Sequence, residues 1–454
     1  MSFIRVPLHG ILKESEGGYF KILDIRGGSF ECSWKTLLVY LFSHKSKTIE
    51  DIYQKCQERK INISSPEIED TFNTLLKNGF LHKVDEEPNE YFDIDTIIRN
   101  SQKEYDFYPR MISLAELEIS IGEKCPYSCS FCYRGDKQSP HNDKAGEKTL
   151  SMKKIQQTIE DASQFGARSI SFTGGELSLD PYFYKIVKVI EFAHSLGYKR
   201  FIVPTTGFNM SEQKIRKLKE LGTTLIISSH ASSEKTSFEI TGHPGSYNNA
   251  LQTTKLALEI GVDSSVTMTV DPNNIKEIPK VVNKYMNLGV DFLRVNPVCP
   301  VGHGETSMLS RNQMKSIFSK VEVLQNIHGK EKVSCPFDVV EEKNYDDPMI
   351  CEGGVSRVYV REDGLVSICP YTAHIPEFKV GNIHEKRLKE LWPTNEVLKN
   401  FRSLTELNDK CYNCRERRYC IDSCWVLAYQ VFEGLNLCSE PDCTRFEEGQ
   451  YEQK

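Results

Sequence analysis

Three closely spaced cysteines are the residues best suited to chemistry in this sequence. Cys125, Cys129 and Cys132 form a C-x3-C-x2-C pattern within eight residues. A structural zinc site needs four protein ligands, and this loop supplies three. Three thiolates suit a [4Fe–4S] cluster in which the protein holds three irons and the fourth iron stays open to an exogenous ligand. The pattern therefore predicts chemistry at an open iron.

A second and larger set of cysteines lies in the last quarter of the chain. It begins with Cys351-x12-Gly364-x4-Cys369. A C-x2-C-x5-C-x3-C run and two further cysteines follow, namely Cys411, Cys414, Cys420, Cys424, Cys438 and Cys443. A zinc ribbon normally shows two short C-x2-C pairs, and this segment has one. Its apolar content is low for a self-supporting core, which is typical of a segment held together by metal.

The composition decides between disulfides and metal ligation for these thiols. The chain has 454 residues, 57 basic and 63 acidic, with 39% hydrophobic residues and 15 cysteines. This balance is typical of a soluble globular protein, and a net charge of −6 disfavours nucleic-acid binding. No apolar run approaches the roughly 18 residues of a membrane span, and residues 1–18 lack the apolar core of a secretory signal. We therefore expect a cytoplasmic protein, without a nucleic-acid or membrane partner, whose thiols stay reduced.

Alternating strands and helices must position the first cysteine loop. The helices between residues 114 and 296 end in an apolar residue followed by glycine, which closes a helix in the left-handed conformation. The strand candidates are 115–121, 169–173, 201–205, 225–229, 265–270 and 292–295. Six βα units predict an α/β fold with a parallel sheet, either a partial barrel or a doubly wound sheet. Both place ligands at the carboxyl ends of the strands.

A glycine turn at the end of the second strand narrows the interpretation. Gly174 and Gly175, followed by Glu176, let a ligand approach the backbone closely. One βα unit after a C-x3-C-x2-C loop, these residues resemble the radical S-adenosylmethionine (SAM) superfamily. The resemblance implies a partial (β/α)6 TIM-type barrel, SAM chelated by the open iron, and a reductant such as flavodoxin or ferredoxin. It also implies a 5′-deoxyadenosyl radical that removes a hydrogen atom from the substrate.

The same resemblance assigns residues to SAM. Gly174, Gly175 and Glu176 match the segment that meets the methionyl amino group, and Phe131 matches the residue whose backbone lies near adenine. The remaining matched positions, on three later strand ends, are Thr206, Ser228 and Val295.

Three positions depart from the family pattern. Thr206 replaces an asparagine, His230 replaces an aspartate and Thr241 replaces an arginine. The last change leaves the partner of the SAM carboxylate unassigned. Catalytic acids and bases are not assigned either, because isolated polar residues near strand ends are usually structural or solvated; those that could approach a substrate are His230, Arg294, His303 and Tyr133.

The later cysteines resemble the SPASM extension of radical SAM peptide and protein maturases, which holds two auxiliary [4Fe–4S] clusters. The resemblance implies that Cys351, Cys369 and Cys424 ligate the first auxiliary cluster. The ligands that it implies for the second are Cys411, Cys414, Cys420 and Cys443.

Some cysteine assignments stay open. Cys443 is preferred to Cys438 because Pro441 and Asp442 before it resemble the closing segment of the family. The first auxiliary cluster takes its fourth ligand from Cys335 or Cys299, or keeps that site open for a substrate thiolate. The remaining cysteines, Cys32 and Cys56, are expected to be small buried hydrophobic residues.

The first 85 residues are expected to form a winged-helix-like α+β module. One helix is predicted to start at Thr48. A second is predicted to have Ser65 as its N-cap and Pro66 at its first helical position, and to end at Asn78-Gly79. Strands are predicted at 19–25 and 80–84. Residues 1–100 hold 13 basic and 16 acidic residues, which opposes DNA binding. The module resembles the PqqD-like peptide-recognition element of ribosomal-peptide (RiPP) maturases, where a leader peptide adds a strand to a sheet edge. The expected groove lies between segments 19–25 and 66–76.

These features predict four segments and one function. The segments are a leader-recognition domain (1–85), a linker (86–110), the radical SAM partial barrel (111–330) and the Fe–S-stapled SPASM domain (331–454). The expected function is maturation of a ribosomally synthesised precursor peptide bound by its leader, with thioether formation of the sactipeptide type. Carbon–carbon crosslinking, another oxidative modification, or modification of a protein as in sulfatase maturases also fits the sequence. A non-catalytic iron–sulfur sensor or DNA regulator is disfavoured by the glycine turn and by the acidic first module.

Overall fold

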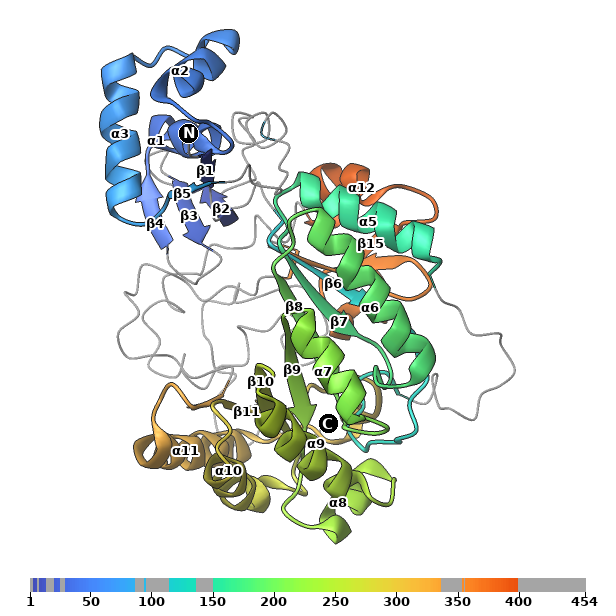
Figure 1. Cartoon of the computed structure of the whole chain (residues 1–454). Helices are drawn as coiled ribbons and strands as arrows, with labels where there is room; N and C mark the ends of the chain where they lie inside the picture. The colour runs from blue at the N-terminus through green and yellow to red at the C-terminus, as the bar shows by residue number, and fades with distance from the viewer. Residues whose placement is uncertain are drawn as a thin grey trace, which may run out of the picture.

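The described residues form a small module within the first 94 residues and a larger sheet-and-helix unit after it (Figure 1). Each has its own large hydrophobic core, and a third, small cluster consists of Tyr359, Leu365 and Ala373. The computed structural model describes residues 3–5, 8–13, 20–24, 29–85, 94, 114–135, 150–335, 353–354 and 356–398. The predicted linker lies almost wholly outside these ranges, as do seven cysteines: Cys351, Cys411, Cys414, Cys420, Cys424, Cys438 and Cys443. Within these ranges, the protein has no helix long and apolar enough to cross a membrane.

The first core belongs to a small α+β module. Its elements are β1 (Phe3–Arg5), β2 (Leu8–Lys13), β3 (Phe20–Asp24), β4 (Ser29–Cys32), α1 (Trp34–Ser43), α2 (Ile49–Glu58), α3 (Ser65–Lys77) and β5 (His82–Val84). Strands β2, β3 and β4 form an antiparallel sheet in that order, and β1 pairs with β5. The predicted strand 19–25 is therefore the central strand of its sheet, and both of its edges are already paired. The prediction of a leader groove along this strand is wrong, because among the described strands of this three-stranded sheet only the outer strands β2 and β4 have an unpaired edge.

The helices of the module confirm one prediction, correct another and add an element that was not predicted. Thr48 caps α2 as expected: its hydroxyl accepts from the Asp51 amide, and the Asp51 carboxylate accepts from the Thr48 amide. The N-cap of α3 is Ser64 rather than Ser65: the Ser64 Oγ accepts from the Glu67 amide, and the Glu67 carboxylate accepts from the Ser64 amide at 2.9 Å. Helix α1 was not predicted. It is a nearly continuous apolar run packed against β3, β4, α2 and α3, so it lacks the one-sided periodicity by which helices are recognised.

The second core is organised by one ten-stranded sheet. Its strands are β6 (Glu116–Ser120), β7 (Ser169–Thr173), β8 (Arg200–Thr205), β9 (Thr223–Ser228), β10 (Ser264–Val270), β11 (Leu293–Pro297), β12 (Val333–Ser334), β13 (Arg357–Val360), β14 (Leu365–Ser367) and β15 (Lys379–Asn382). The α-helices are α5 (Met152–Gln164), α6 (Asp180–Ser195), α7 (Glu212–Glu220), α8 (Glu234–Thr241), α9 (Ser246–Ile260), α10 (Ile278–Asn287), α11 (Arg311–His328) and α12 (Leu388–Thr394).

The strand order distinguishes a partial barrel from a doubly wound sheet, the two architectures that the sequence leaves open. Strands β6 to β11 are neighbours in chain order and all parallel, so the sheet never reverses its winding direction. A doubly wound sheet requires such a reversal. The fold is accordingly the partial α/β barrel. The five expected helix-closing glycines all have positive φ: Gly166, Gly197, Gly222, Gly261 and Gly289.

The two faces of the sheet differ in chemistry. On β6, Leu117 and Ile119 are fully buried in the core shared with the helices, whereas Glu116, Glu118 and Ser120 alternate with them and lie on the opposite, inner face. The SPASM segment continues this sheet: β13 pairs in parallel with β6, and β14 and β15 follow antiparallel. This extension was not predicted, since the segment was expected to contain only short helices.

Candidate active site

The loop with the first three cysteines leaves the carboxyl end of β6 and is docked by its backbone. The Ser128 amide donates to the Thr241 carbonyl at 2.9 Å, and the Ser130 amide donates to the Ile240 carbonyl at 2.8 Å. On another side, the His303 amide donates to the Cys132 carbonyl at 2.9 Å. The end of α8 and the short helix Gly302–Thr306 therefore fix the loop that we call the cluster loop, residues 121–135.

The predicted glycine turn touches the beginning of the same loop. The Gly175 amide donates to the Gly122 carbonyl and the Glu176 amide to the Lys124 carbonyl, both at 2.9 Å. A Cβ on Gly175 would lie 2.0 Å from the Lys124 oxygen, so only glycine fits there. The structure thus brings together the two motifs that the sequence separates by about 40 residues.

Glu176 accepts hydrogen bonds through its carboxylate from the ends of neighbouring strands. Its fully buried carboxylate accepts from the Thr205 hydroxyl at 2.6 Å, the Thr206 amide at 2.8 Å and the Ser178 amide at 3.0 Å. The Thr206 hydroxyl donates to it as well. These bonds join the carboxyl ends of β7 and β8, so Glu176 positions the turn while the backbone of Gly174 and Gly175 faces the cluster loop.

The chemistry of the three thiols fits an iron–sulfur cluster. Burial raises the pKa of the Cys125 thiol to about 12, and burial together with the charges of Cys132 and Cys125 raises the pKa of Cys129 well above its ordinary value. Three adjacent thiolates therefore need a positive partner, which metal ligation supplies. Among the described residues no three His, Cys, Asp or Glu side chains converge on a single ion position. Cys125, Cys129 and Cys132 would hold a cluster, whose irons are spread over a larger body than one ion.

The other residues matched to SAM lie around this loop with different surroundings. The Phe131 ring contacts the His230 ring with centroids 4.8 Å apart. Burial lowers the pKa of His230 to about 4, so its imidazole is neutral, and its Nδ1 accepts from the Thr269 amide. A neutral histidine therefore stands where the family pattern has an aspartate. Ser228 ends β9 and is half-buried, whereas the side chain of Val295 is fully buried in the core.

Thr241 carries no charge and so cannot pair with a carboxylate as the arginine of the family pattern would. Its buried hydroxyl donates to the Ser237 carbonyl at 2.7 Å and contacts the Ser246 hydroxyl at 2.9 Å. It thus closes α8 internally, and the sequence offers a SAM carboxylate no cation at this position.

Cys369, the one cysteine of the predicted auxiliary-cluster set that the structure describes, lies in a segment that contacts the cluster loop. Tyr371, two residues after Cys369, contacts the ring of Tyr133, the residue after Cys132, with centroids 5.1 Å apart. Tyr371 also lies within electrostatic range of both Cys299 and Cys369. Cys335 instead lies near Arg294. Of the two open candidates for a fourth ligand, Cys299 is the one placed in the neighbourhood of Cys369.

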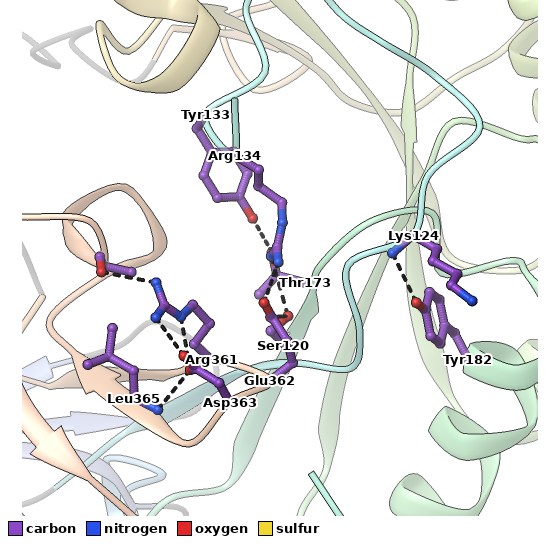
Figure 2. A network of polar contacts seen from close by, with 11 residues as sticks. Ser120, Lys124, Tyr133, Arg134, Thr173, Tyr182, Arg361, Glu362, Asp363 and Leu365 are labelled. Carbon is purple, nitrogen blue, oxygen red and sulfur yellow. Dashed lines mark hydrogen bonds and ion pairs between the residues drawn. The ribbon is translucent and has the colours of Figure 1, made fainter. Parts of the chain in front are cut away.

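Sequence reasoning missed a polar network beside the cluster loop (Figure 2). Arg134 pairs with Glu362 at 2.6 Å, and both side chains are almost completely buried. Ser120 hydrogen-bonds both members of this pair. The partners lie 228 residues apart, so no local spacing signals them.

Two family models match the chain. Residues 119–285 match the Radical SAM superfamily, and residues 351–415 match the SPASM iron–sulfur cluster-binding domain. A "Probable GTP 3′,8-cyclase" of Saccharolobus islandicus strain M.14.25 / Kamchatka #1 is 27% identical over 268 residues, which cover 57% of this chain and 83% of that protein. A protein of the same description from Sulfurisphaera tokodaii is 25% identical over 270 residues, 57% of this chain and 82% of its own.

Solved structures match more of the chain at lower identity. Streptococcus suis SuiB bound to S-adenosylmethionine is 16% identical, with a TM-score of 0.65 over 95% of this chain and 97% of that one. SuiB bound to precursor peptide SuiA gives the same score and identity over 96% and 97%. anSMEcpe with bound AdoMet is 17% identical, with a TM-score of 0.54 over 68% and 89%. At these identities the likeness concerns the fold.

Proposed function

We propose that this chain, a radical SAM iron–sulfur enzyme with a SPASM domain, modifies a ribosomally synthesised precursor peptide by forming a thioether between a cysteine sulfur and a carbon atom. The observation that carries the proposal is the extent of the likeness to SuiB, which has been solved with its precursor peptide: it spans 96% of this chain. The matched part of the GTP 3′,8-cyclases spans 57%. The likeness to the fold of a protein that binds a precursor peptide therefore extends well beyond the segment shared with the cyclases.

The proposed roles follow the geometry. Cys125, Cys129 and Cys132 hold the cluster that binds SAM, and Cys369 belongs to the first auxiliary cluster. The SAM-bound cluster supplies abstraction of a hydrogen atom, and the auxiliary clusters accept the electron that crosslinking releases. The docked cluster loop and the glycine turn orient SAM. The remaining assignments, Cys351, Cys411, Cys414, Cys420, Cys424 and Cys443, rest on the spacing resemblance alone.

The leader peptide is proposed to add a strand to β4 rather than to β3. β4 is an outer strand of its sheet, and its Phe30 packs on Phe80, which follows α3, with ring centroids 4.0 Å apart. A peptide paired with the free edge of β4 would extend the sheet by one strand. Anchoring by the leader raises the effective concentration of a weakly bound core peptide at the radical site.

The proposal is tested by mass spectrometry of candidate precursor peptides encoded beside the gene. Reconstituted full-length protein, SAM and a reductant are incubated with each peptide, and in parallel with GTP. A thioether removes two hydrogen atoms from the peptide and protects one cysteine from iodoacetamide. Loss of hydrogen with the thiol still reactive would indicate a carbon–carbon crosslink and contradict the thioether. Conversion of GTP without any change in peptide mass would refute the maturase proposal.

A further inference from the structure

The end of the cluster loop is held by the SPASM segment. Arg134 lies two residues after Cys132, and Glu362 lies in the turn that connects β13 and β14, seven residues before Cys369. The Arg134 guanidinium contacts Glu362 Oε1 at 2.6 Å, and the two side chains are 5% and 4% exposed. The pair therefore joins the predicted ligand loops of two different clusters through one contact in the protein interior (Figure 2).

A residue of the barrel, Ser120, hydrogen-bonds both members of this ion pair. Ser120 ends β6, the strand that leads into the cluster loop, and its hydroxyl donates to Glu362 Oε2. The Arg134 Nη1 lies 3.4 Å from the same hydroxyl. Both carboxylate oxygens of Glu362 are thus used, one by each partner. A buried ion pair in which every carboxylate oxygen accepts a hydrogen bond has one favoured geometry. It therefore fixes the relative position of the two segments that carry it.

The neighbouring residue fixes the same end of the loop in two further directions. The Tyr133 hydroxyl lies 2.8 Å from the Thr173 hydroxyl, immediately before the glycine turn. The Tyr133 ring packs on Tyr371, two residues after Cys369. Tyr133 and Arg134 therefore tie the cluster loop both to the glycine turn and to the segment around Cys369.

We infer that Arg134 and Glu362 are positioning residues that make the SPASM turn a working part of the SAM site. The ion pair holds the cluster loop in place beside the glycine turn, and these two segments would hold SAM. SAM binding consequently depends on a residue of the SPASM segment even when no peptide is present. The inference requires radical SAM chemistry but no particular peptide substrate.

The test uses apolar replacement of both partners. Full-length R134M/E362M removes both buried charges together, a change that is usually tolerated, whereas either single change leaves a charge unpaired. Reconstituted proteins are titrated with SAM in the absence of peptide. The readouts are the SAM-induced change in the EPR spectrum of the reduced cluster, the SAM concentration that half-saturates 5′-deoxyadenosine formation, and hydrogen exchange of residues 121–135 and 357–369.

A second ion pair, in which the carboxylate is buried and the arginine side chain is 32% exposed, provides the control. Arg387, at the start of α12, pairs with the fully buried Asp161 of α5, with Nε to Oδ2 at 3.1 Å. It also joins the SPASM segment to the barrel, but it does not touch the cluster loop. R387M/D161M loosens this other contact with the same substitutions.

R134M/E362M is expected to need about tenfold more SAM for half-saturation, since a small misplacement of groups at a reacting site lowers the rate by a large factor. Exchange is expected to rise in both segments, with R134K intermediate, whereas R387M/D161M keeps the wild-type SAM response. Wild-type SAM response and exchange in R134M/E362M would overturn the inference, and so would an equal loss in R387M/D161M. If R134M/E362M fails to fold, R134K and E362Q decide: their SAM response must be weakened at wild-type iron content, and an unchanged response refutes the inference.

Discussion

The glycine turn offers a sharp test of the site, because two glycines isolate two different physical effects. Gly175 has no positive φ, so replacing it with alanine adds only a Cβ, 2.0 Å from the Lys124 oxygen and 2.4 Å from the Lys124 carbonyl carbon. Gly222 has a φ of +66° and nothing within 4 Å, so Gly222→Ala adds only backbone strain. The first change perturbs the contact between the glycine turn and the cluster loop, and the second does not.

The expected magnitudes follow from these contacts. An ordinary Cβ contact is longer than that at Gly175 by more than an ångström, and two backbone hydrogen bonds resist the required movement. Overpacking costs about 1–3 kcal/mol, and each of the two strained bonds costs about 1 kcal/mol, so Gly175→Ala should cost about 3–5 kcal/mol locally. The left-handed backbone at Gly222 should cost alanine about 1–2 kcal/mol.

The assay compares global stability with cluster properties in the two variants. Gly222→Ala should lower the melting temperature while iron content and SAM binding stay at wild-type values. Gly175→Ala should reduce the iron held per chain and weaken SAM binding, because Lys124 directly precedes Cys125. Wild-type iron content and SAM affinity in Gly175→Ala would refute the argument that the close approach of the turn shapes the site.

Two further predictions concern buried charge and the cysteines. Burial raises the pKa of Glu118 from 4.5 to about 7, with Glu116 adding to the rise and Arg357 opposing it. The folded state therefore binds this proton more tightly than the unfolded state, and stability falls by about 3 kcal/mol as pH rises through this window. Calorimetry should accordingly give Glu118→Gln a higher melting temperature than the wild type, by a margin that grows from pH 5 to pH 8. A difference in melting temperature that does not change with pH would contradict the assignment. Cys132→Ala and Cys369→Ala should each lose about four irons per chain on reconstitution while the buried Cys32→Ala loses none, and equal iron in all three would argue against the ligand assignments.

Much of the barrel could be predicted because its signals are local. The strands are short segments that are apolar or alternate with apolar residues, and five helices end in an apolar residue and a glycine that closes them within one turn. The predicted segment 169–173 coincides with β7, and the other predicted strands of the barrel agree within one or two residues at each end. The cluster loop and the glycine turn are equally local, so their types and spacing sufficed to identify them.

The failures have a common physical cause. Helix α1 is buried nearly all round, so its residues carry no amphipathic period. The pairing of β3 on both sides depends on strands whose partners the sequence does not identify, and strand position within a sheet is what decides whether a peptide can be added. In both cases the missing information concerns neighbours distant in the chain.

The placement of the SPASM segment follows from the strand that it extends. β13 pairs in parallel with β6, with Tyr359 opposite Glu118 and Val360 opposite Ile119. Because β6 leads directly into the cluster loop, the register of this one pair sets how far the turn with Glu362 stands from Arg134. Hydrophobic residues of β13 and β14 share the barrel core, so the register is specified by burial on one face. A slip of one residue would turn those side chains to the inner face and separate the ion pair. The sheet therefore positions the region of Cys369 relative to Cys132 independently of any metal in the later segment.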